Sequence, residues 1–252
     1  MLRKILIVLG TLALLAPAVH AQTVDEIIAK NVEALGGMDK LQSVKTMRST
    51  ATLKQGSFEA AVESENKRPD KVRQEFILQG LAQVAAYDGK VGWQVNPFQG
   101  RKDPELLSAD DTKDLQIAAD IDGPLVNYRE KGSVAELVGH DSVEGTDCYK
   151  IKLTLKNGDV RTYYLDADSY MVIKLETQTI IRGSLQERET YYGDYEKVDG
   201  IYFPFSSESA QKDQPDRVQI VLNKLEVNVP LDDSRFTVPG GKAAGKGTGG
   251  GK

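Results

Sequence analysis

The alternation of apolar and polar side chains is clearest between residues 148 and 176. Four apolar residues there alternate with polar ones, Tyr149, Ile151, Leu153 and Leu155 with Lys150, Lys152, Thr154 and Lys156. Successive side chains of a strand point to opposite faces, so the segment predicts a strand with one buried face. Asn157-Gly158 tolerates the positive φ of a tight turn, and residues 166–169 predict a second one. The stretch therefore predicts three consecutive antiparallel strands.

Segments of the same kind recur along the rest of the chain. They cover residues 44–53, 57–65, 72–79, 81–87, 91–95, 134–138, 184–196, 201–205 and 217–227. Tight turns such as Asp88-Gly89 separate neighbouring segments, which is typical of a meander and not of βαβ units. With roughly ten or eleven strand signals, one sheet has to curl, split or close. We expect a mainly β fold with helices (α+β), in which one domain over residues 22–239 forms a curved antiparallel sheet, an unclosed barrel.

Two parts of the chain carry helical signals. Thr23 and Glu26 form a capping box, apolar residues recur at helical spacing through Leu35, and Gly36-Gly37 ends the predicted N-terminal helix. The two-residue period is lost between about residues 97 and 131, where capping residues precede a short apolar stripe. This helical insertion either plugs one end of the β-core or forms a lid over a cavity, and its length favours a lid.

Both ends of the chain differ in composition from the middle. Residues 1–21 combine Arg3 and Lys4 with a long apolar run and a small-residue exit at Ala21, the pattern of a secretory signal peptide. Cleavage there would leave Gln22 first, where a lipid anchor would need a cysteine, so we expect a soluble exported protein. Residues 240–252 have hardly any apolar content and predict a disordered Gly/Lys tail.

Charge and the scarcity of reactive side chains narrow the function. Without Arg3 and Lys4, 30 of the 32 basic residues stand against 37 acidic ones, a net charge of −7 that argues against a nucleic-acid partner. His140 is the one histidine beyond the signal peptide, and Cys148 is the one cysteine. We expect His140 in a surface turn and Cys148 in a packed strand. The sequence therefore predicts no enzyme, no metal site and no cofactor.

Two motifs that look like catalytic or nucleotide sites have simpler explanations. Residues 240–246 match G-x-x-x-x-G-K, but Gly247 stands where a magnesium-binding Ser or Thr is needed. The paired aspartates lie in predicted turns or helix starts, where aspartate bonds to nearby backbone: Asp110-Asp111, Asp166 with Asp168, and Asp232-Asp233. A hydrolase that uses such carboxylates is the third of three functional hypotheses.

An open barrel of this size leaves an interior that side chains need not fill. Each methylene moved from water into it is worth about 0.8 kcal/mol, so one long acyl chain gains on the order of 10 kcal/mol before opposing costs. The predicted lipid-binding lining is Phe76, Leu78, Trp93, Tyr149, Ile151, Leu153, Leu165 and Ile173, with Leu115 and Leu125 on the lid side. The alternative for each of them is ordinary core packing.

Several short motifs occur in order along the chain. They are Leu35-Gly36-Gly37-Met38-Asp39-Lys40-Leu41, Arg68-Pro69-Asp70-Lys71-Val72-Arg73, Tyr87-Asp88-Gly89 with Trp93, and Asp194-Tyr195 with Val198-Asp199-Gly200-Ile201-Tyr202-Phe203-Pro204. With them the chain resembles the outer-membrane lipoprotein-sorting proteins of the LolA/LolB-like superfamily over nearly all of its mature length. The resemblance implies an unclosed barrel around helices, whose hydrophobic cavity receives acyl chains of lipoproteins or a related lipid in the periplasm.

The resemblance also implies partners and a lid mechanism. Such a carrier, expected to be a monomer, takes its cargo from an inner-membrane donor and passes it to an outer-membrane acceptor. An arginine latches the helical lid in these carriers, and Arg68 and Arg73 are the candidates here. The missing anchor cysteine favours the soluble carrier branch or a divergent relative. The main alternative is a protein-interaction or envelope-stress-sensing module on the same fold, without catalysis.

Overall fold

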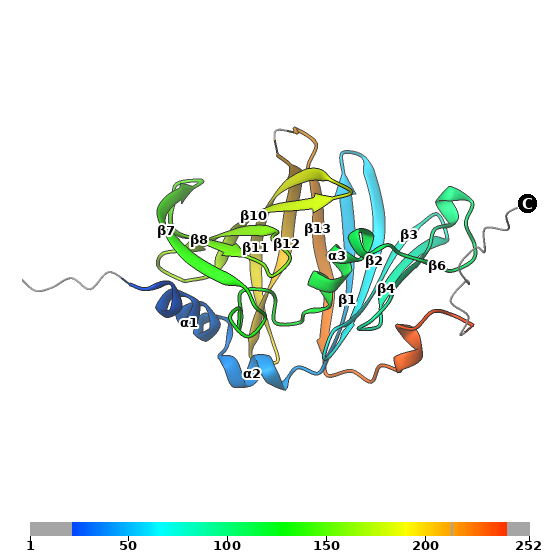
Figure 1. Cartoon of the computed structure of the whole chain (residues 1–252), viewed down its shortest axis with the longest axis horizontal. Coiled ribbons are helices and arrows are strands. Elements are labelled where there is room, and N and C mark those ends of the chain that lie inside the picture. Colours follow the sequence, from blue (N-terminus) through cyan, green and yellow to red (C-terminus); the bar gives the residue numbers. More distant parts are fainter. Residues whose placement is uncertain (1–21, 213, 241–252) are drawn as a thin grey trace, which may run out of the picture.

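The computed structural model describes residues 22–212 and 214–240, so the predicted signal peptide and most of the predicted tail lie outside the described residues. Within this part of the chain, thirteen strands form one antiparallel sheet in the order β6-β5-β4-β3-β2-β1-β13-β12-β11-β10-β9-β8-β7. The sheet is broad, curved and not closed into a barrel (Figure 1). The predicted fold class is confirmed, with slightly more strands than the pattern indicated.

The sheet consists of two meanders joined at its centre. The first contains β1 (Thr46–Gln55), β2 (Phe58–Lys67), β3 (Lys71–Leu78), β4 (Leu81–Tyr87), β5 (Gly92–Val95) and β6 (Glu105–Leu106). The second contains β7 (Val134–Val143), β8 (Thr146–Thr154), β9 (Val160–Asp166), β10 (Val172–Ile181), β11 (Ser184–Val198), β12 (Ile201–Gln211) and β13 (Val218–Val227). β1 and β13 pair from Met47 opposite Val227 to Lys54 opposite Gln219. The sheet edges are therefore β6 and β7, which follow one another in the chain.

Helices α1 (Val24–Leu35) and α3 (Ala109–Ala119) lie on the same side of the sheet, which we call the inner face. The predicted capping box of α1 is present, since Thr23 accepts a hydrogen bond from the backbone of Glu26 and the Glu26 carboxylate accepts one from the backbone of Thr23. The apolar stripe of α1 packs through Ile27 and Ile28 against β8 and β9. A helix with one apolar stripe buries it in this way, and the contact fixes α1 over the second meander.

The short helix α2 (Met38–Ser43) follows α1 at once and leads into the sheet. The turn between the two helices requires glycine at Gly36, which has φ of 132°. A Cβ atom at this position would lie 2.6 Å from the carbonyl oxygen of Gly200, closer than two such atoms can approach. The close approach of Gly36 to Gly200 holds the end of α1 against the turn between β11 and β12.

Residues 107–133 connect the two edge strands across the inner face. α3 covers the first meander, where Leu115 and Ala119 pack against Val72 and Tyr87. The residues after α3 cover the second meander, where Leu125 and Tyr128 join the cluster around α1. The predicted insertion, residues 97–131, begins before this connection: the structure divides it into η1 (Pro97–Gln99), β6, α3 and the residues that follow α3.

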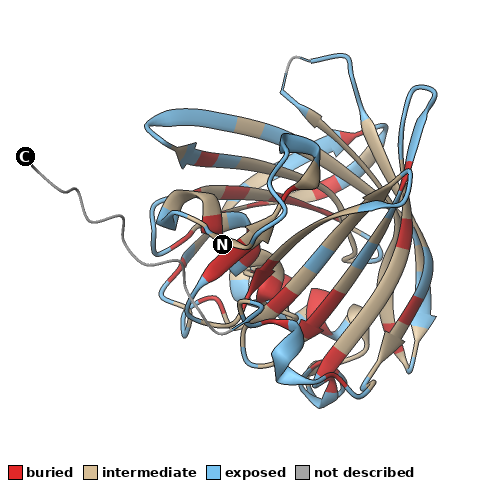
Figure 2. Cartoon of the chain, turned by 90° about the vertical axis from the view of Figure 1, so that its right-hand side faces the viewer, coloured by how far each residue is buried: buried red, intermediate tan, exposed pale blue. Residues whose placement is uncertain are grey.

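The C-terminal segment covers part of the opposite, outer face of the sheet. It includes η2 (Asp233–Arg235) and Phe236, which is completely buried. Trp93 points to this face, is 1% exposed, and donates a hydrogen bond from Nε1 to the carbonyl oxygen of Phe236 at 2.7 Å. Figure 2 shows the buried positions along the middle of the strands and on the helices, whereas the hairpin ends at the rim are exposed.

The two reactive side chains of the described region both lie in the second meander. Cys148 is buried on the outer face with Val143 and Tyr164, as expected of a packed strand residue, and burial raises the pKa of its thiol. The prediction that His140 lies in a turn is wrong. β7 continues past a bulge after Leu137, so His140 is an exposed strand residue opposite Tyr149.

Candidate functional site

The inner face carries an apolar cavity of about 380 Å³ between the sheet and the segments that cross it. Helices α1 and α2 bound one side, residues 117–126 of the connecting segment bound a second, and strands β9 to β12 form the wall. The lining side chains are mostly apolar or aromatic, and include Leu35, Ile117, Ile121, Leu125, Tyr163, Val172, Leu175, Tyr192, Tyr195 and Phe203. Ligand pockets usually measure about 300–1,000 Å³ and are lined in this way.

A β-bulge in β10 aims two of the lining residues into the cavity. The register between β9 and β10 shifts between Val172 and Lys174, so that Ile173 is the extra residue. A bulge interrupts the alternation of faces. Val172 and Leu175 therefore both point to the inner face, although three positions separate them. Tyr195 of β11 lies beside them and donates a hydrogen bond to the carbonyl oxygen of Val172 at 2.7 Å.

The cavity tyrosines are held in their neutral form. Burial raises the pKa of Tyr163, Tyr192 and Tyr195, because a buried phenolate would lose its hydration. The three rings contribute apolar surface to the wall, and the Tyr195 hydroxyl donates its hydrogen bond to the backbone of β10.

A second cavity of about 460 Å³ adjoins the first on the inner face. Both are lined by Ile117, Arg161, Leu175 and Tyr192, so the two cavities meet along these side chains. The second cavity is more polar, with Thr177, Thr179, Gln186 and Thr190 in its wall. Polarity therefore increases along the inner face from the α1 side toward the hairpin ends of β10 and β11.

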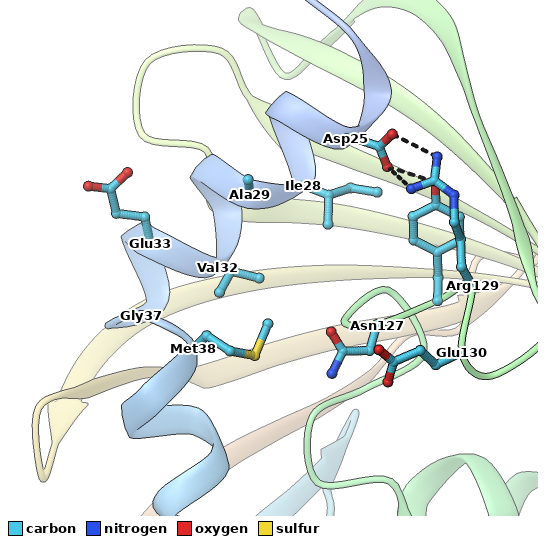
Figure 3. A pocket seen from close by; sticks show the side chains of 11 residues that line it. Asp25, Ile28, Ala29, Val32, Glu33, Gly37, Met38, Asn127, Arg129 and Glu130 are labelled. Carbon is cyan, nitrogen blue, oxygen red and sulfur yellow. Dashed lines mark hydrogen bonds and ion pairs between the residues drawn. The ribbon is translucent and has the colours of Figure 1, made fainter.

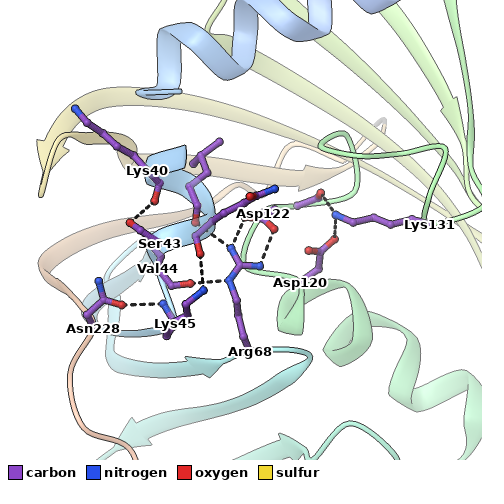
Figure 4. A network of polar contacts seen from close by, with 12 residues as sticks. Lys40, Ser43, Val44, Lys45, Arg68, Asp120, Asp122, Lys131 and Asn228 are labelled. Atoms are coloured by element: carbon purple, nitrogen blue, oxygen red, sulfur yellow. Dashed lines mark hydrogen bonds and ion pairs between the residues drawn. The ribbon is translucent and has the colours of Figure 1, made fainter. Parts of the chain in front are cut away.

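Arg68 joins the connecting segment to the rest of the fold. Its Nη1 and Nη2 atoms donate to the two oxygens of Asp122 at 2.7 and 2.5 Å (Figure 4). The same guanidinium donates to the carbonyl oxygens of Leu41 and Val44 at 3.0 and 2.6 Å. Its hydrogen bond with Asp122 raises the pKa of Arg68. Because Asp122 is part of the cavity wall, this network holds one wall in place.

A groove of about 570 Å³ lies on the other side of α1, between the helix and residues 127–130 (Figure 3). The Asp25 carboxylate accepts hydrogen bonds from both terminal nitrogens of Arg129 at 2.7 Å and from the hydroxyl of Tyr128 at 2.8 Å. The hydrogen bond with Arg129 lowers the pKa of Asp25. These contacts fasten the connecting segment to α1, further along the segment than Asp122, which Arg68 holds.

Known protein structures share this architecture. A family model described as an uncharacterized protein matches residues 125–239, and no curated protein matches the sequence. A LolA superfamily protein from Nitrosomonas europaea has a TM-score of 0.59 at 14% identity, over 86% of this chain and 98% of its own. The chain has the LolA fold.

Two further solved structures share the LolA fold with this chain. A DUF1329 family protein from Desulfovibrio piger has a TM-score of 0.59 at 15% identity, covering 86% of this chain and 98% of its own. A domain from Vibrio parahaemolyticus assigned to outer membrane lipoprotein sorting has a TM-score of 0.56 at 12% identity, covering 84% and 94%. At these identities the likeness concerns the fold alone.

Four of the eight predicted lining residues lie on the inner face of this LolA fold and pack against α1, so they fill space instead of surrounding it. Ile151, Leu153 and Leu165 are completely buried against α1, and Tyr149 is partly buried beside them. The core-packing alternative therefore describes these four. Of the two predicted lid residues, Leu125 lines the cavity, whereas Leu115 packs α3 onto β3 and β4.

The other predicted site residues lie away from the cavity. Phe76 stacks on Phe58 at 6.2 Å and meets Phe98 edge-on at 5.9 Å, far along the first meander, where Leu78 also lies. The assignments of Trp93 and Ile173 to the lining are wrong, because both point to the outer face. Trp93 is covered there by the C-terminal segment, and Ile173 packs with Cys148 and Tyr164.

The two candidate latch residues also separate. Arg68 reaches the connecting segment, as described above. Arg73 lies on the outer face, where its Nε donates to Glu75 at 2.8 Å and its guanidinium stands 5.8 Å from the centre of the Trp93 ring. Of the two, the Arg68 side chain is the one that bonds to a residue of the connecting segment.

The tyrosines and the β10 residues of the lining were missed by the sequence analysis. Tyr163 alternates with Leu165 and could have been found by extending the pattern of β9, and Phe203 shares a face with Ile201. Val172 and Leu175 carried no such signal because of the bulge. Among residues 22–212 and 214–240, no helix is long and apolar enough to cross a membrane, and no group of three metal-ligating side chains is gathered.

Proposed function

We propose that the protein is a non-catalytic periplasmic carrier that holds an acyl chain of a lipid or lipoprotein in the inner-face cavity. The observation that carries this proposal is the cavity of about 380 Å³, bounded by apolar and aromatic side chains on the inner face of a LolA fold. Ten buried methylenes would gain about 8 kcal/mol from transfer out of water before opposing costs. Affinity of this kind needs no catalytic group, in keeping with the neutral tyrosines of the wall.

The connecting segment is the element that admits the chain. Asp122, Pro124 and Leu125 form one wall of the cavity, and this wall is held by the bidentate contact of Arg68. Release of that contact would let residues 120–126 move away from the strands without disturbing the sheet. A monomer loaded in this way would receive its cargo at the inner membrane and deliver it to an acceptor at the outer membrane.

The first test is a search for cargo. The protein, exported and gently purified, should carry a lipid that native mass spectrometry detects as added mass, and the stripped protein should take up a fluorescent fatty-acid probe. A protein that is consistently empty and also fails to bind the probe would contradict the proposal. That result would favour the protein-interaction alternative, which crosslinking in intact cells would then test.

A matched pair of substitutions on β10 locates the binding site. Leu175→Trp should fill the cavity and weaken probe binding at least about tenfold, because the larger ring occupies the space of the acyl chain. Ile173→Trp places the same ring two positions earlier on the outer face and should leave probe affinity within about twofold of wild type. Cooperative thermal unfolding should first establish that both variants are folded. Equal loss of binding in the two variants, or no loss in Leu175→Trp, would place the site elsewhere.

A further inference from the structure

We propose that Arg161 binds the anionic headgroup, a carboxylate or a phosphate, of an amphiphile whose acyl chain lies in the inner-face cavity. This rests on the proposed carrier function and specifies the class of ligand. The proposal begins from a buried charge without a counterion. Arg161 is 8% exposed, its Nε is buried without a hydrogen-bond partner, and its side chain forms no ion pair within the described residues.

A buried arginine in this state is costly and therefore informative. Charged side chains are rarely buried unless they are paired, because removing a charge from water is expensive and a partner must compensate for it. The other inner-face arginine at the connecting segment, Arg68, follows this rule with two oxygens of Asp122. Arg161 is 8% exposed but has no carboxylate beside it within the described residues. An anionic ligand would supply the missing partner for the Arg161 guanidinium.

The position of Arg161 matches the junction between the head and the tail of an amphiphile. The residue lies on the inner face of β9 and lines both the apolar cavity and the adjoining polar one. On the apolar side the neighbouring wall consists of Tyr163, Leu175 and Tyr192. A chain in the apolar cavity would therefore have its polar end at Arg161, with the second cavity open for the rest of the headgroup.

A second cation extends the site across the sheet. Thr177 of β10 is paired with Arg161 on one side and with Arg188 of β11 on the other, so the three residues form one row on the inner face. Arg188 is exposed to solvent, lines the second cavity and forms no ion pair within the part of the chain that the structure describes. Two arginines with a hydroxyl between them offer planar donor groups that suit a carboxylate or a phosphate.

The acidic residues of the second cavity do not neutralise this row. Glu187 accepts a hydrogen bond from Gln178 at 2.8 Å and lies 3.4 Å from the Lys212 ammonium. Asp114, on α3, lines the cavity but stands beyond ion-pair distance of Arg161. The net charge along the row of Arg161 and Arg188 is therefore positive, which favours an anion.

The test compares ligands that differ only in the charge of the head. Wild-type protein should bind palmitic acid at a pH where it is ionised roughly 10- to 100-fold more tightly than hexadecanol, since a hydrogen bond to a charged group is worth about 1.5–3 kcal/mol. Arg161→Met retains the length of the side chain without its charge and should bind both ligands with equal affinity. Arg217→Met, which removes a cation paired with Glu208 outside both cavities, is the matched control and should keep the preference.

The melting temperature distinguishes a ligand-binding arginine from one that only supports the fold. Because Arg161 is buried and unpaired, Arg161→Met should raise the melting temperature of the ligand-free protein while it removes the preference for the anion. A lower melting temperature together with an unchanged preference for palmitate would overturn the proposal. If the Met variant does not fold, Arg161→Gln serves for the same comparison.

Two further outcomes separate this inference from the proposed function and identify the anion. A wild-type protein that binds palmitate and hexadecanol equally would refute the headgroup site and leave the carrier function intact, whereas binding of neither ligand would refute both. Lysophosphatidic acid with the same chain distinguishes the source of the charge. Tighter binding of this phosphate than of palmitate, lost in Arg188→Met as well as in Arg161→Met, would assign the row to a phosphate. Tighter binding of palmitate would assign Arg161 to a carboxylate, and equal binding would show that Arg161 accepts either anion.

Discussion

At the scale of single residues, the position of one extra residue decides which side chains face the ligand. The alternation that begins at Tyr149 holds through Leu155, and its inner-face assignment could be predicted from the sequence. The same alternation continued into β10 gives Ile173 the wrong face, because the bulge between Val172 and Lys174 shifts the pattern. Nothing in the local sequence marks that bulge, which depends on the strand opposite. The face to which a side chain points is therefore predictable from the sequence only within regular strands.

Whether an inward side chain fills space or surrounds it also depends on distant parts of the chain. Ile151 and Leu153 were expected to line a cavity and instead touch Ile27 and Ile28 of α1. The periodicity of both elements was correctly predicted, but periodicity carries no information on where the helix lies over the sheet. The cavity begins where α1 ends, beside Leu35 and α2. Sequence reasoning can therefore name inward residues but not the boundary of the void.

Tyr170 provides a prediction at the residue scale that does not depend on the ligand. Its hydroxyl accepts a hydrogen bond from the Lys30 ammonium at 3.0 Å, and this contact lowers the pKa of Tyr170 to about 8. We expect one tyrosine of the folded protein to ionise near that pH, while the buried cavity tyrosines remain protonated. Lys30→Met should return the titration of Tyr170 toward the ordinary value, as followed by the absorbance of the phenolate.

The same pair has a defined effect on stability. The pKa of Tyr170 is lower in the folded protein, at about 8, than the ordinary value of 10.0, so ionisation favours folding. This contribution is complete above pH 10 and is lost as the pH falls through 8. The free energy of unfolding of wild type should therefore rise relative to Lys30→Met between these two values. A constant difference across that range would show that Lys30 and Tyr170 are not coupled.

At the scale of elements, the sequence left two roles open for the helical insertion, a plug of the core or a lid over a cavity, and the connecting segment combines them. Loss of the strand period marks residues 97–131, which include most of this segment, although the structure places η1 and the two-residue strand β6 in the first part of that range. α3 acts as a plug, since it buries Leu115 against the first meander. The residues that follow α3 form a wall of the cavity and are held by side-chain contacts. We propose the lid role for residues 120–126. The sequence predicted a lid as one of two alternatives, but it did not predict which residues would form it.

The contact between Arg68 and Asp122 should control how often the connecting segment moves away from the sheet. Arg68→Met leaves the Asp122 carboxylate, 11% exposed, without its partner, so the free energy of unfolding should fall by about 2 kcal/mol. Amide hydrogen exchange should accelerate in residues 120–126, and uptake of the fatty-acid probe should become faster because the wall opens more often. Urea denaturation and exchange mass spectrometry measure the two effects.

Arg73→Met is the control for this substitution, because it removes an equal charge from the outer face of β3. It should change stability through its contacts with Glu75 and Trp93 but leave exchange in residues 120–126 as in wild type. Acceleration in both variants would mean that the segment responds to global stability and not to the contact between Arg68 and Asp122.

At the scale of the whole molecule, the fold depends on the pairing of its first and last strands. Strands that follow one another in the chain account for every neighbour in the sheet except β1 and β13. The turns predicted most of these hairpins, but not the pairing of β5 with β6, which lies in the predicted helical insertion. The pairing of β1 with β13 was not predictable either, because a two-residue period does not specify a distant partner. This one pairing unites two meanders and leaves β6 and β7 as edges. The connection between these two edges crosses the inner face, where Ile117 and residues 121–126 form part of the cavity wall.

One proline substitution in a central strand and one in an edge strand test whether the fold depends on the pairing of β1 with β13. Val221 of β13 is paired with Thr52 of β1 and Ser206 of β12, so its backbone N–H has a neighbouring strand whichever way it points. Val221→Pro should remove a ladder hydrogen bond at the centre and lower the free energy of unfolding by at least about 2 kcal/mol. Val138→Pro lies in the bulge of the edge strand β7 and is half exposed, where proline is tolerated better.

The two variants should also differ in how the protein unfolds. If the β1–β13 pairing unites the meanders, Val221→Pro should separate them, and urea unfolding followed by tryptophan fluorescence should no longer coincide with unfolding followed by circular dichroism. Trp93, the one tryptophan, lies in the first meander and reports on that half alone. Val138→Pro should keep the two transitions together, since the central pairing is intact. Coincident transitions in Val221→Pro with unchanged stability would show that the meanders are held together chiefly by the helices of the inner face.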